Sequence, residues 1–354
     1  MTANRRGAPL EELATRLQGV LAADAVLANE PMARYTALRI GGPADLLAIA
    51  GNVDELCRSI TLAWQLGVPC RVIGAGSNVL ISDAGVEGLV VLNRARAITF
   101  HLPGEPGSHL DLPTVEAEGG ASLSTVARRC VGRGLAGLEW AATIPGTVGG
   151  AVVGNAGAWG GDVASALLRA QILEAAGKVV DWPVDRFQYG YRASILKKET
   201  VADEHRPVVL KAEFTLYPGE RAALEARVAE MASRRKVSQP AGASCGSVFK
   251  NPPGDHAGRL IESAGLKGVS SGAAEISPVH ANFIVNQGGA RAADVKALIE
   301  LTRRRIQAQF GVTLNLEIQL VGRWSGEQQV SPRTTGGFQE PRVGSRGEAH
   351  GTTR

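Results

Sequence analysis

The sequence is poor in the residues that build metal sites and disulfide frameworks. It has only four cysteines in 354 residues, and no two of them form a CxxC pair. Zinc and iron–sulfur sites need closely spaced ligands, so we expect no metal centre. Four cysteines in a chain of this length do not suggest a disulfide scaffold, and a reduced cytosol fits this usage. The four are Cys57, Cys70, Cys130 and Cys245.

Long apolar runs are also absent. No stretch of about 18 consecutive apolar residues occurs in the sequence, so we expect no membrane span. The first residues, MTANRRGAPLEEL, lack the apolar core of a signal peptide. The sequence therefore predicts a cytoplasmic protein without a membrane partner.

Neither sign of charge is in large excess. Lysine and arginine number 38 against 34 aspartates and glutamates, which gives a net charge of +4. The two basic runs, at 234–236 and 303–305, are each three residues long and typical of the solvent-facing side of a helix. Because no nucleic-acid-binding module accompanies them, we expect no nucleic-acid partner. A few phosphates on a small ligand suit this balance.

Glycine, in contrast, is abundant. The chain has 44 glycines, whereas an average usage of about 7% predicts roughly 25. They gather in a few short stretches rather than in a repeat. Clustered glycine indicates a backbone that turns tightly or approaches a ligand closely.

Apolar periodicity divides the chain into alternating helices and strands, which predicts an α/β (α+β) protein. We expect helices at 9–21, 53–66, 122–134, 220–236, 257–264 and 292–309. We expect strands at 46–50, at 70–81 on both sides of a glycine turn, within 114–119, 170–183 and 207–218, and at 283–287 and 314–322. Long loops are expected at 137–161 and 237–247, and the polar end of the chain is expected to be disordered. The predicted segments are a leader and helix (1–22), two α/β units (23–95 and 96–218), a C-terminal α/β domain (219–322) and the tail (323–354), with a flexible leader at 1–8.

The first glycine cluster, residues 74–78, follows an apolar strand. It lacks the Gly-Lys-Ser/Thr of a Walker loop. It also lacks the third glycine and the helix of a Rossmann fingerprint, because Val79 begins another strand. Two interpretations remain: a nest of amides that meets a pyrophosphate, or a tight hairpin turn.

The second and third clusters, residues 144–151 and 154–161, are rich in glycine and alanine. This composition permits an extended backbone to lie against a flat ligand. A purely structural loop would rarely need so many glycines, so the clusters together favour a nucleotide site.

Residues 242–246 spell the GxSxG of a serine hydrolase, with His256 and His280 downstream. That motif requires an apolar strand before its serine, here Ser244, and a helix after it. Polar residues precede it and Val-Phe-Lys-Asn-Pro-Pro follows. We interpret the match as accidental, and we expect Cys245 only to pack in the loop.

Several longer stretches resemble the UDP-N-acetylenolpyruvoylglucosamine reductase family. They occur in that family's order and cover roughly residues 25–322. The stretches are YTALRIGGPAD (35–45), VIGAGSNVLISD (72–83), GLEWAATIPGTVGGAVVGNAGAWGG (137–161), YGYRASILKKE (189–199), SCGSVFKNPPG (244–254) and LNLEIQLVG (314–322).

The resemblance implies an FAD-binding fold of the p-cresol methylhydroxylase type, made of two subdomains, and a C-terminal substrate domain. NADPH and a UDP-sugar enolpyruvyl ether are the implied partners, and we expect a monomer. The pyrophosphate of FAD would lie near residues 74–78 and the flavin edge near 143–157. The implied cofactor residues are Gly74, Ala75, Gly76, Ser77, Asn78, Ile144, Pro145, Gly146, Gly149, Gly150, Asn155 and Gly157.

The resemblance also implies roles in the reaction. Ser247 matches the family's proton donor, Arg192 its contact to the substrate carboxylate, and Glu317 the group that polarises the enolpyruvyl ether. The implied substrate-binding residues are Tyr191, Arg235, Lys250 and Asn251. The chain is too short to hold the tyrosine loop that one branch of the family inserts. Two alternatives stay open: a flavin oxidase of the same fold, and a non-catalytic nucleotide-binding protein.

Overall fold

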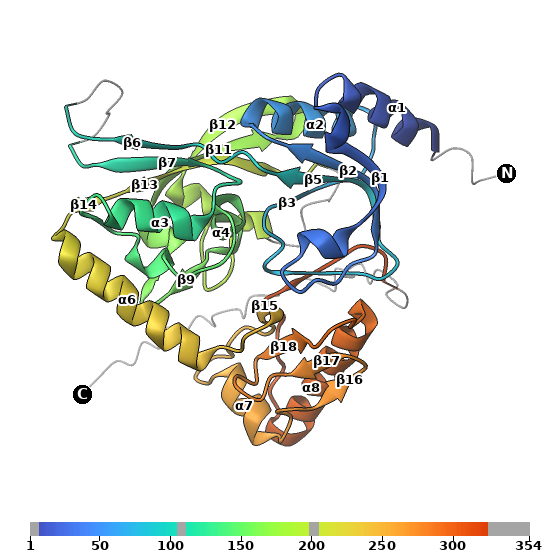
Figure 1. The fold of residues 1–354 in the computed structure, drawn as a ribbon, viewed down its shortest axis with the longest axis vertical. Helices are drawn as coiled ribbons and strands as arrows, with labels where there is room; N and C mark the ends of the chain where they lie inside the picture. The colour runs from blue at the N-terminus through green and yellow to red at the C-terminus, as the bar shows by residue number, and fades with distance from the viewer. Residues whose placement is uncertain (1–6, 105–110, 198–204, 325–354) are drawn as a thin grey trace, which may run out of the picture. The chain divides into compact units, whose positions relative to one another are not determined.

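The computed structural model describes residues 7–104, 111–197 and 205–324 (Figure 1). The predicted tail lies almost wholly outside the described residues. Helix α1 (Gly7–Gln18) already begins at Gly7, so the predicted leader of eight residues was too long. Among the described residues, no helix combines the length and apolarity needed to cross a bilayer.

The first sheet has the strand order β1-β2-β5-β3, with β2, β5 and β3 parallel and β1 antiparallel at the edge. Its strands are β1 (Val26–Pro31), β2 (Pro43–Ala50), β3 (Cys70–Ile73) and β5 (Val86–Asn93). Leu46 and Ala48 face helices α1 and α2 (Val53–Gln65), whereas Leu47 packs in the cluster on the other face. Burial on both faces explains the nearly continuous apolar run of β5.

The second sheet is antiparallel, with the order β12-β11-β13-β7-β6. Its strands are β6 (Ile98–His101), β7 (Thr114–Glu118), β11 (Leu167–Glu174), β12 (Lys178–Pro183) and β13 (Val208–Thr215). Helices α3 (Leu123–Val131) and α4 (Val148–Gly154) bury their apolar residues in the core formed with this sheet. On its other face, Leu173 and Leu210 join the cluster around α2. The two sheets therefore share one core through α2.

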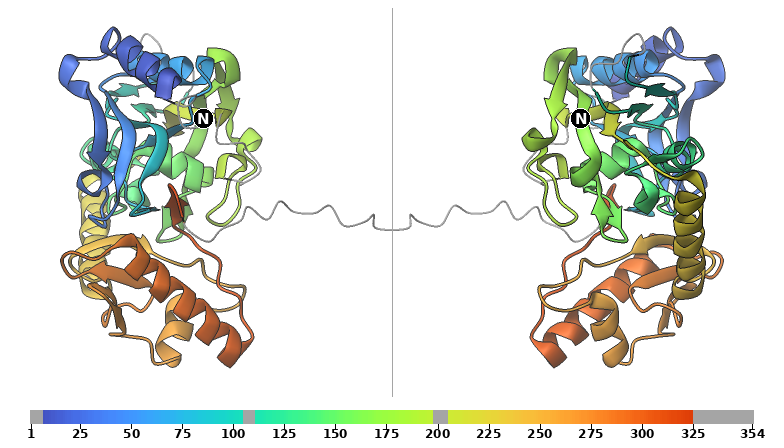
Figure 2. Two further views of the ribbon diagram at one scale, coloured as in Figure 1. Left: turned by 90° about the vertical axis from the view of Figure 1, so that its right-hand side faces the viewer. Right: turned by 90° about the vertical axis from the view of Figure 1, so that its left-hand side faces the viewer.

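The C-terminal elements form a third, antiparallel sheet with the order β15-β18-β17-β16. Its members are β15 (Ala243–Ser247), β16 (Ser270–Ser271), β17 (Ala274–Ile276) and β18 (Phe283–Asn286). Helix α6 (Arg221–Ser238) leads into this sheet, and α7 (Ala257–Ser263) and α8 (Ala292–Phe310) accompany it (Figure 2). The mixed α/β architecture expected from the sequence is confirmed, while the domain boundaries stay a prediction.

Short elements complete the described chain. The remaining strands are β4 (Val79–Ile81), β8 (Leu135–Ala136), β9 (Gly157–Ala158), β10 (Gly161–Asp162), β14 (Tyr217–Pro218) and β19 (Gln319–Val321), and α5 spans Val163–Ala166. The 3-10 helices are η1 (Ala23–Ala25), η2 (Met32–Tyr35), η3 (Glu139–Ala141), η4 (Ala175–Gly177), η5 (Val184–Phe187) and η6 (Ile195–Lys197).

The expected final strand at 314–322 is largely wrong. Only Gln319–Val321 forms a strand, β19, which pairs in parallel with β4. Upstream, Leu316 bridges Phe249 and the Glu317 N–H donates to the Val248 carbonyl. After Glu317 the chain leaves the Val248–Phe249 segment and joins β4, so Glu317 lies at a bend before the strand rather than within it.

Two predicted loops contain regular structure. In the expected loop 237–247, residues 243–247 form β15 because β18 supplies their hydrogen-bond partners. In the expected loop 137–161, residues 148–154 form helix α4 rather than an extended backbone. The Thr147 side chain caps this helix. The small residues of α4 allow the helix to pack closely on the second sheet, where a Cβ on Gly149 would lie 3.1 Å from the Gly119 carbonyl. Composition alone could not reveal that contact.

Helix α8 begins against a carboxylate from the distant β4–β5 turn. The two carboxylate oxygens of Asp83 accept the N–H groups of Ala292 and Ala293 at 2.8 and 2.9 Å. Helix N-termini leave such donors without intrahelical partners, and a negative charge there is favourable. Asp83 thus ties the C-terminal elements to the first sheet.

We expect Asp83→Ala to destabilise the protein by about 1–2 kcal/mol, the usual effect of removing a helix cap. The midpoint of urea unfolding should fall, and the amide protons of Ala292 and Ala293 should exchange faster with solvent. Asp24→Ala, at an exposed carboxylate of η1, is the matched control. Equal unfolding midpoints for the two variants would contradict this role.

Candidate active site

One cavity of about 380 Å³ lies where the three sheets approach one another. Both predicted glycine segments contribute to its wall, together with residues from β3, β4, α4, β15 and the approach to β19. The predicted cofactor residues that line it are Gly74, Ala75, Gly76, Ser77, Asn78, Ile144, Pro145, Gly146, Gly149, Gly150 and Gly157. Segments some 70 residues apart in the sequence therefore form one surface.

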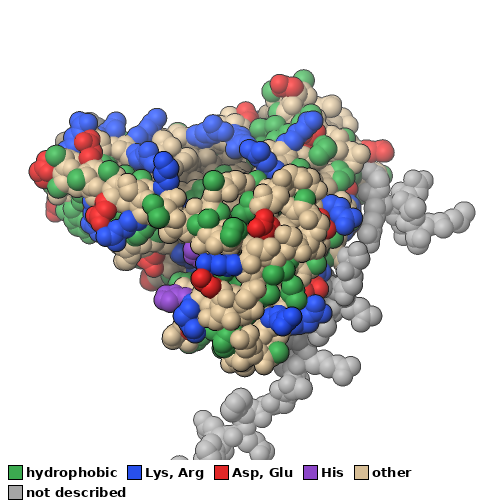
Figure 3. All heavy atoms as spheres, turned by 60° about the horizontal axis from the view of Figure 1, so that its bottom comes forward, with side chains coloured by type: hydrophobic (Ala, Val, Ile, Leu, Met, Phe, Trp, Pro, Cys, Tyr) green, Lys and Arg blue, Asp and Glu red, His purple; other side chains and the backbone are tan. Residues whose placement is uncertain are grey.

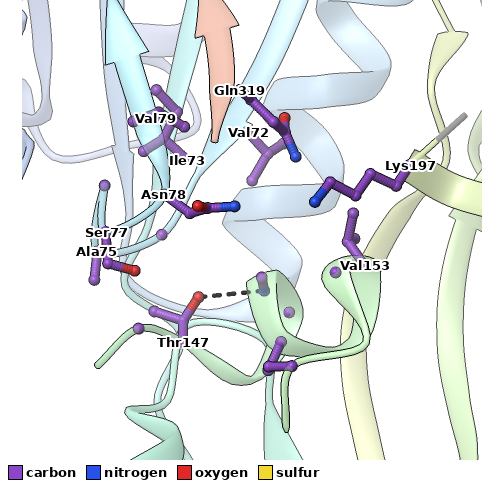
Figure 4. Close-up of a pocket in the computed structure, with 18 of the residues that line it drawn as sticks. Val72, Ile73, Ala75, Ser77, Asn78, Val79, Thr147, Val153, Lys197 and Gln319 are labelled. Atoms are coloured by element: carbon purple, nitrogen blue, oxygen red, sulfur yellow. Dashed lines mark hydrogen bonds between the residues drawn. The ribbon is translucent and has the colours of Figure 1, made fainter. Parts of the chain in front are cut away.

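The two glycine segments touch at Gly74. A Cβ at that position would clash with the Thr147 side chain, whose Oγ1 accepts the Gly150 N–H at 3.4 Å (Figure 4). Gly76 has φ +60°, and a Cβ there would clash with the Tyr35 carbonyl. Only glycine satisfies both the close approach and the left-handed backbone.

The turn at 74–78 is not a hairpin. Strand β3 pairs with β5 in the first sheet, whereas β4 pairs with β19. The hairpin interpretation is therefore wrong, and the turn instead borders the cavity.

Positive charge dominates the cavity wall. Five basic side chains line it, but Glu317 is the one acidic residue among its described lining residues. The five are Arg71, Arg192, Lys197, Arg206 and Arg235. Such an excess in a partly enclosed space favours anionic ligands. Arg71, Lys197, Arg206 and Thr147 were not predicted from the sequence, although Lys197 belongs to the YGYRASILKKE stretch.

Arg192 and Glu317 form the central ion pair of the cavity. Arg192 Nε lies 2.9 Å from Glu317 Oε1, with the two side chains 24% and 17% exposed. Arg192 Nε has no hydrogen-bond partner, so its contact with Glu317 is that of an ion pair. The guanidinium also donates to the carbonyls of Gly157 at 2.6 Å and Asn155 at 3.4 Å. Arg192 has φ +53°, an unfavourable backbone conformation held in place by these contacts.

Glu317 and Lys197 have shifted ionisation. Burial raises the pKa of Glu317, and the nearby cations Arg192, Lys197 and Lys250 oppose this shift. Burial also lowers the pKa of Lys197 to about 8, with Lys250 and Arg192 acting in the same direction and Glu317 against them. Shifts of this kind gather at functional sites.

Ser247 also lines the cavity, at the end of β15. The chain after it runs beside the segment that carries Glu317. Lys250 N–H donates to the Asn315 carbonyl at 2.9 Å, and Glu317 N–H donates to the Val248 carbonyl at 2.9 Å. These bonds place the predicted proton donor and the predicted carboxylate on neighbouring strand-like segments.

Four predicted residues are not among those that line the cavity. Tyr191 is 57% exposed, and neither Lys250 nor Asn251 is part of the wall. Asn155 is buried: its side chain donates to the Gly190 carbonyl and accepts the Ala164 N–H. It therefore joins the end of α4 to the turn before Arg192. A ligand contact of these four residues stays a prediction.

The alternative nucleophile motifs do not form sites. Ser244 lies within β15, opposite Val285 on β18, without the helix that a hydrolase elbow requires. Cys245 is buried, and burial raises the pKa of its thiol to about 12, which leaves it uncharged.

No group of three or more metal-ligating side chains occurs in the described parts of the chain. On the face shown in Figure 3, basic and acidic side chains are interspersed rather than gathered by sign.

Comparison with known families identifies two regions that contribute to the cavity. A model of the FAD binding domain matches residues 44–182, and a model of the C-terminal domain of UDP-N-acetylenolpyruvoylglucosamine reductase matches residues 238–321. A curated UDP-N-acetylenolpyruvoylglucosamine reductase from Chloroflexus aggregans is 47% identical over 83% of this chain and 96% of its own length. The chain belongs to the UDP-N-acetylenolpyruvoylglucosamine reductase family.

Other members of the UDP-N-acetylenolpyruvoylglucosamine reductase family agree with this result. The relative from Rubrobacter xylanophilus is 45% identical over 83% of this chain and 94% of its own. The crystal structure of the Thermus caldophilus enzyme matches 84% of this chain and 98% of its own, with 34% identity and a TM-score of 0.68. The chain is accordingly an FAD-dependent oxidoreductase of this family.

The cavity fits FAD in composition. Its glycine segments leave backbone exposed where a flat ring system needs close approach, and its cations complement a pyrophosphate. We expect the backbone of residues 74–78 and 144–150 to hold the cofactor. We expect the side chains near Arg192 to border the reacting end of the cofactor.

Gly150 gives a direct test of this assignment. A Cβ there would make only an ordinary 3.6 Å contact with Thr147 Oγ1, so the folded chain tolerates it, but the methyl group would stand at the cavity wall. We expect Gly150→Ala to leave the unfolding midpoint of the FAD-free protein unchanged or slightly raised, since alanine favours a helix. The dissociation constant for FAD should rise at least about tenfold, roughly 1.4 kcal/mol.

The matched control is Gly132→Ala, at the end of α3 and outside the cavity wall, where φ is −62°. FAD titrations monitored by flavin fluorescence supply the measurement. Unchanged affinity in Gly150→Ala would remove this face of α4 from the cofactor site.

Proposed function

We propose that the chain reduces UDP-N-acetylglucosamine enolpyruvyl ether to UDP-N-acetylmuramate in peptidoglycan precursor synthesis, with NADPH as reductant. The observation that carries this proposal is the meeting of Arg192, Ser247 and Glu317 in the cavity that the glycine segments line. Family membership supports the substrate. A monomer and a cytoplasmic location, both expected from the sequence, stay predictions.

The reaction requires a hydride at one carbon of the enol ether and a proton at its neighbour. FAD, when bound, supplies the hydride. Ser247 Oγ holds the proton and gives it to the neighbouring carbon. A hydroxyl is a weak acid, so this transfer requires a strongly basic carbon atom. The carbon becomes basic only as negative charge builds on the enolpyruvyl group.

Arg192 and Glu317 are proposed to control that charge. The Arg192 guanidinium is held by the Gly157 and Asn155 carbonyls, so it presents a fixed cation to a substrate carboxylate. Preorganised charge is effective because nothing has to rearrange during the reaction. Glu317, whose pKa burial raises, lies against this cation and polarises the ether side of the substrate.

Arg235 is the proposed contact to the substrate phosphates. It lines the cavity, and burial lowers the pKa of its guanidinium. Among the described residues, no carboxylate forms an ion pair with it. A half-buried guanidinium without an anion suits the diphosphate of a UDP-sugar. Tyr191, Lys250 and Asn251 stay further proposed contacts.

The decisive test is NADPH oxidation by the FAD-loaded protein with and without the enolpyruvyl ether. We expect fast oxidation only when the ether is present, and formation of UDP-N-acetylmuramate in equal amount. NADH in place of NADPH measures the nucleotide preference. Equal oxidation in both conditions would indicate an oxidase and overturn the proposal.

The role of Ser247 is tested in the two half-reactions separately. Ser247→Ala should leave flavin reduction by NADPH within about threefold of the wild type, because no proton is delivered to the substrate in that step. Flavin reoxidation by the ether should slow by about 10²–10⁴-fold, the usual effect of losing a general acid. Stopped-flow absorbance measures both steps, with Ser244→Ala as the matched control. Equal loss in both half-reactions would remove Ser247 from this role.

A further inference from the structure

Lys197 occupies an unusual position in the cavity. It ends η6, and its Nζ donates to the backbone carbonyl of Glu317 at 3.1 Å. Asn78 Nδ2 donates to the same carbonyl at 3.2 Å. Figure 4 shows the side chains of Lys197 and Asn78 pointing toward one another from opposite sides of the cavity. The Glu317 carbonyl is therefore held from two distant parts of the chain.

The Glu317 backbone needs this support because it lies at a bend. Its N–H is bound by the Val248 carbonyl, and two residues later Gln319 N–H donates to the Asn78 carbonyl at 3.0 Å. These bonds connect it to β15 and to the 74–78 turn. Lys197 supplies a further hydrogen bond, to the Glu317 carbonyl, and it belongs to the same segment as Arg192. One segment thus contacts Glu317 twice, through its carbonyl and through its carboxylate.

We propose that Lys197 is a positioning residue of the reaction site, which fixes the Glu317 carbonyl and thereby keeps the Glu317 carboxylate against Arg192. This inference rests on the proposed function of Glu317. It concerns the geometry of the carboxylate rather than a contact between Lys197 and the substrate.

The charges around Lys197 make a purely structural role unfavourable. The groups facing it are Glu317 at the bend, Arg192 before η6 and Lys250 after β15. The Arg206 guanidinium also lies near, bonded to the Leu196 carbonyl. Helix α4, which packs against η6, brings no titratable side chain. A neutral side chain could occupy this position without placing another positive charge within a partly buried group of cations. The ammonium therefore does something other than fill space.

The same surroundings determine the pH above which the hydrogen bond from the Lys197 ammonium to the Glu317 carbonyl weakens. Burial and the neighbouring cations lower the pKa of Lys197 to about 8. The ammonium is present below that pH and loses its proton above it. A neutral amine binds the carbonyl more weakly, because hydrogen bonds from charged donors are the stronger ones. Substrate reduction should therefore fall as pH rises through about 8.

The experiment compares Lys197→Met, Lys197→Arg and the control Lys178→Met, an exposed lysine of β12. FAD content and unfolding midpoint are measured first. In Lys197→Met we expect kcat to fall about 10–100-fold with KM within about threefold, as for a displaced catalytic group. The fall of kcat above pH 8 should disappear. Lys197→Arg should restore most of kcat and shift the fall to higher pH, and Lys178→Met should behave as the wild type.

Other outcomes overturn the proposal. A raised KM with unchanged kcat would mean that Lys197 binds the substrate directly. Unchanged kinetics in Lys197→Met would remove any role. Should Lys197→Met fail to fold, Lys197→Arg decides alone, because an alkaline fall that stays at the wild-type pH would contradict the inference.

Failure of the proposed function is distinguishable, because the wild type itself would then show no turnover with the enolpyruvyl ether. The FAD-free protein supplies a separate readout in that case. Carboxyl 13C spectra of glutamate-labelled protein, with Glu317→Gln to assign the signal, report the pKa of Glu317. It should rise in Lys197→Met and stay unchanged in Lys197→Arg. An unchanged pKa in Lys197→Met would show that the ammonium does not act on Glu317.

Discussion

The Glu317 carboxylate lies 2.9 Å from Arg192 Nε in a cavity where burial favours its protonated form. A buried carboxylate is tolerated only with cations and hydrogen bonds around it, since desolvation is otherwise too unfavourable. Arg192, Lys197 and Lys250 supply the cations. Asn78 and Lys197 also bind the Glu317 backbone carbonyl, so three distant segments meet here: the turn at 74–78, the segment from Gly190 to Lys197, and the C-terminal bend. Each also lines the cavity. The constraint that holds one acidic group therefore shapes the whole reaction site.

Small residues satisfy a second constraint, the need for backbone beside the ligand. Gly74 allows the Thr147 side chain to approach, and Gly149 allows α4 to pack on the end of β7. The same absence of side chains leaves backbone exposed along the cavity wall. Close packing and access for a flat cofactor are thus both served by small residues at these positions.

Much of the fold could be predicted from the sequence. Helices α2, α6 and α8 and strands β2, β7 and β18 follow from apolar periodicity because their patterns are strong and local. The errors occurred where partners are distant in sequence. Strand β15 exists because β18 pairs with it, and α4 forms although glycine disfavours helices, since Thr147 caps it and the second sheet packs against it. Likewise β19 is short because its chain leaves Val248 to join β4.

The sequence by itself indicated a nucleotide ligand and showed that no cysteines are spaced closely enough for a metal site. It also carried the resemblance that singled out Arg192, Ser247 and Glu317. Those conclusions depend on residue types and their spacing along the chain. Only the tertiary structure decided that Lys197 binds the Glu317 carbonyl, that Asn155 supports the turn before Arg192, and that Tyr191 is exposed. The physical reason is that burial, hydrogen-bond partners and ionisation depend on what surrounds a side chain in space. For the Glu317 carbonyl those neighbours come from positions more than a hundred residues away.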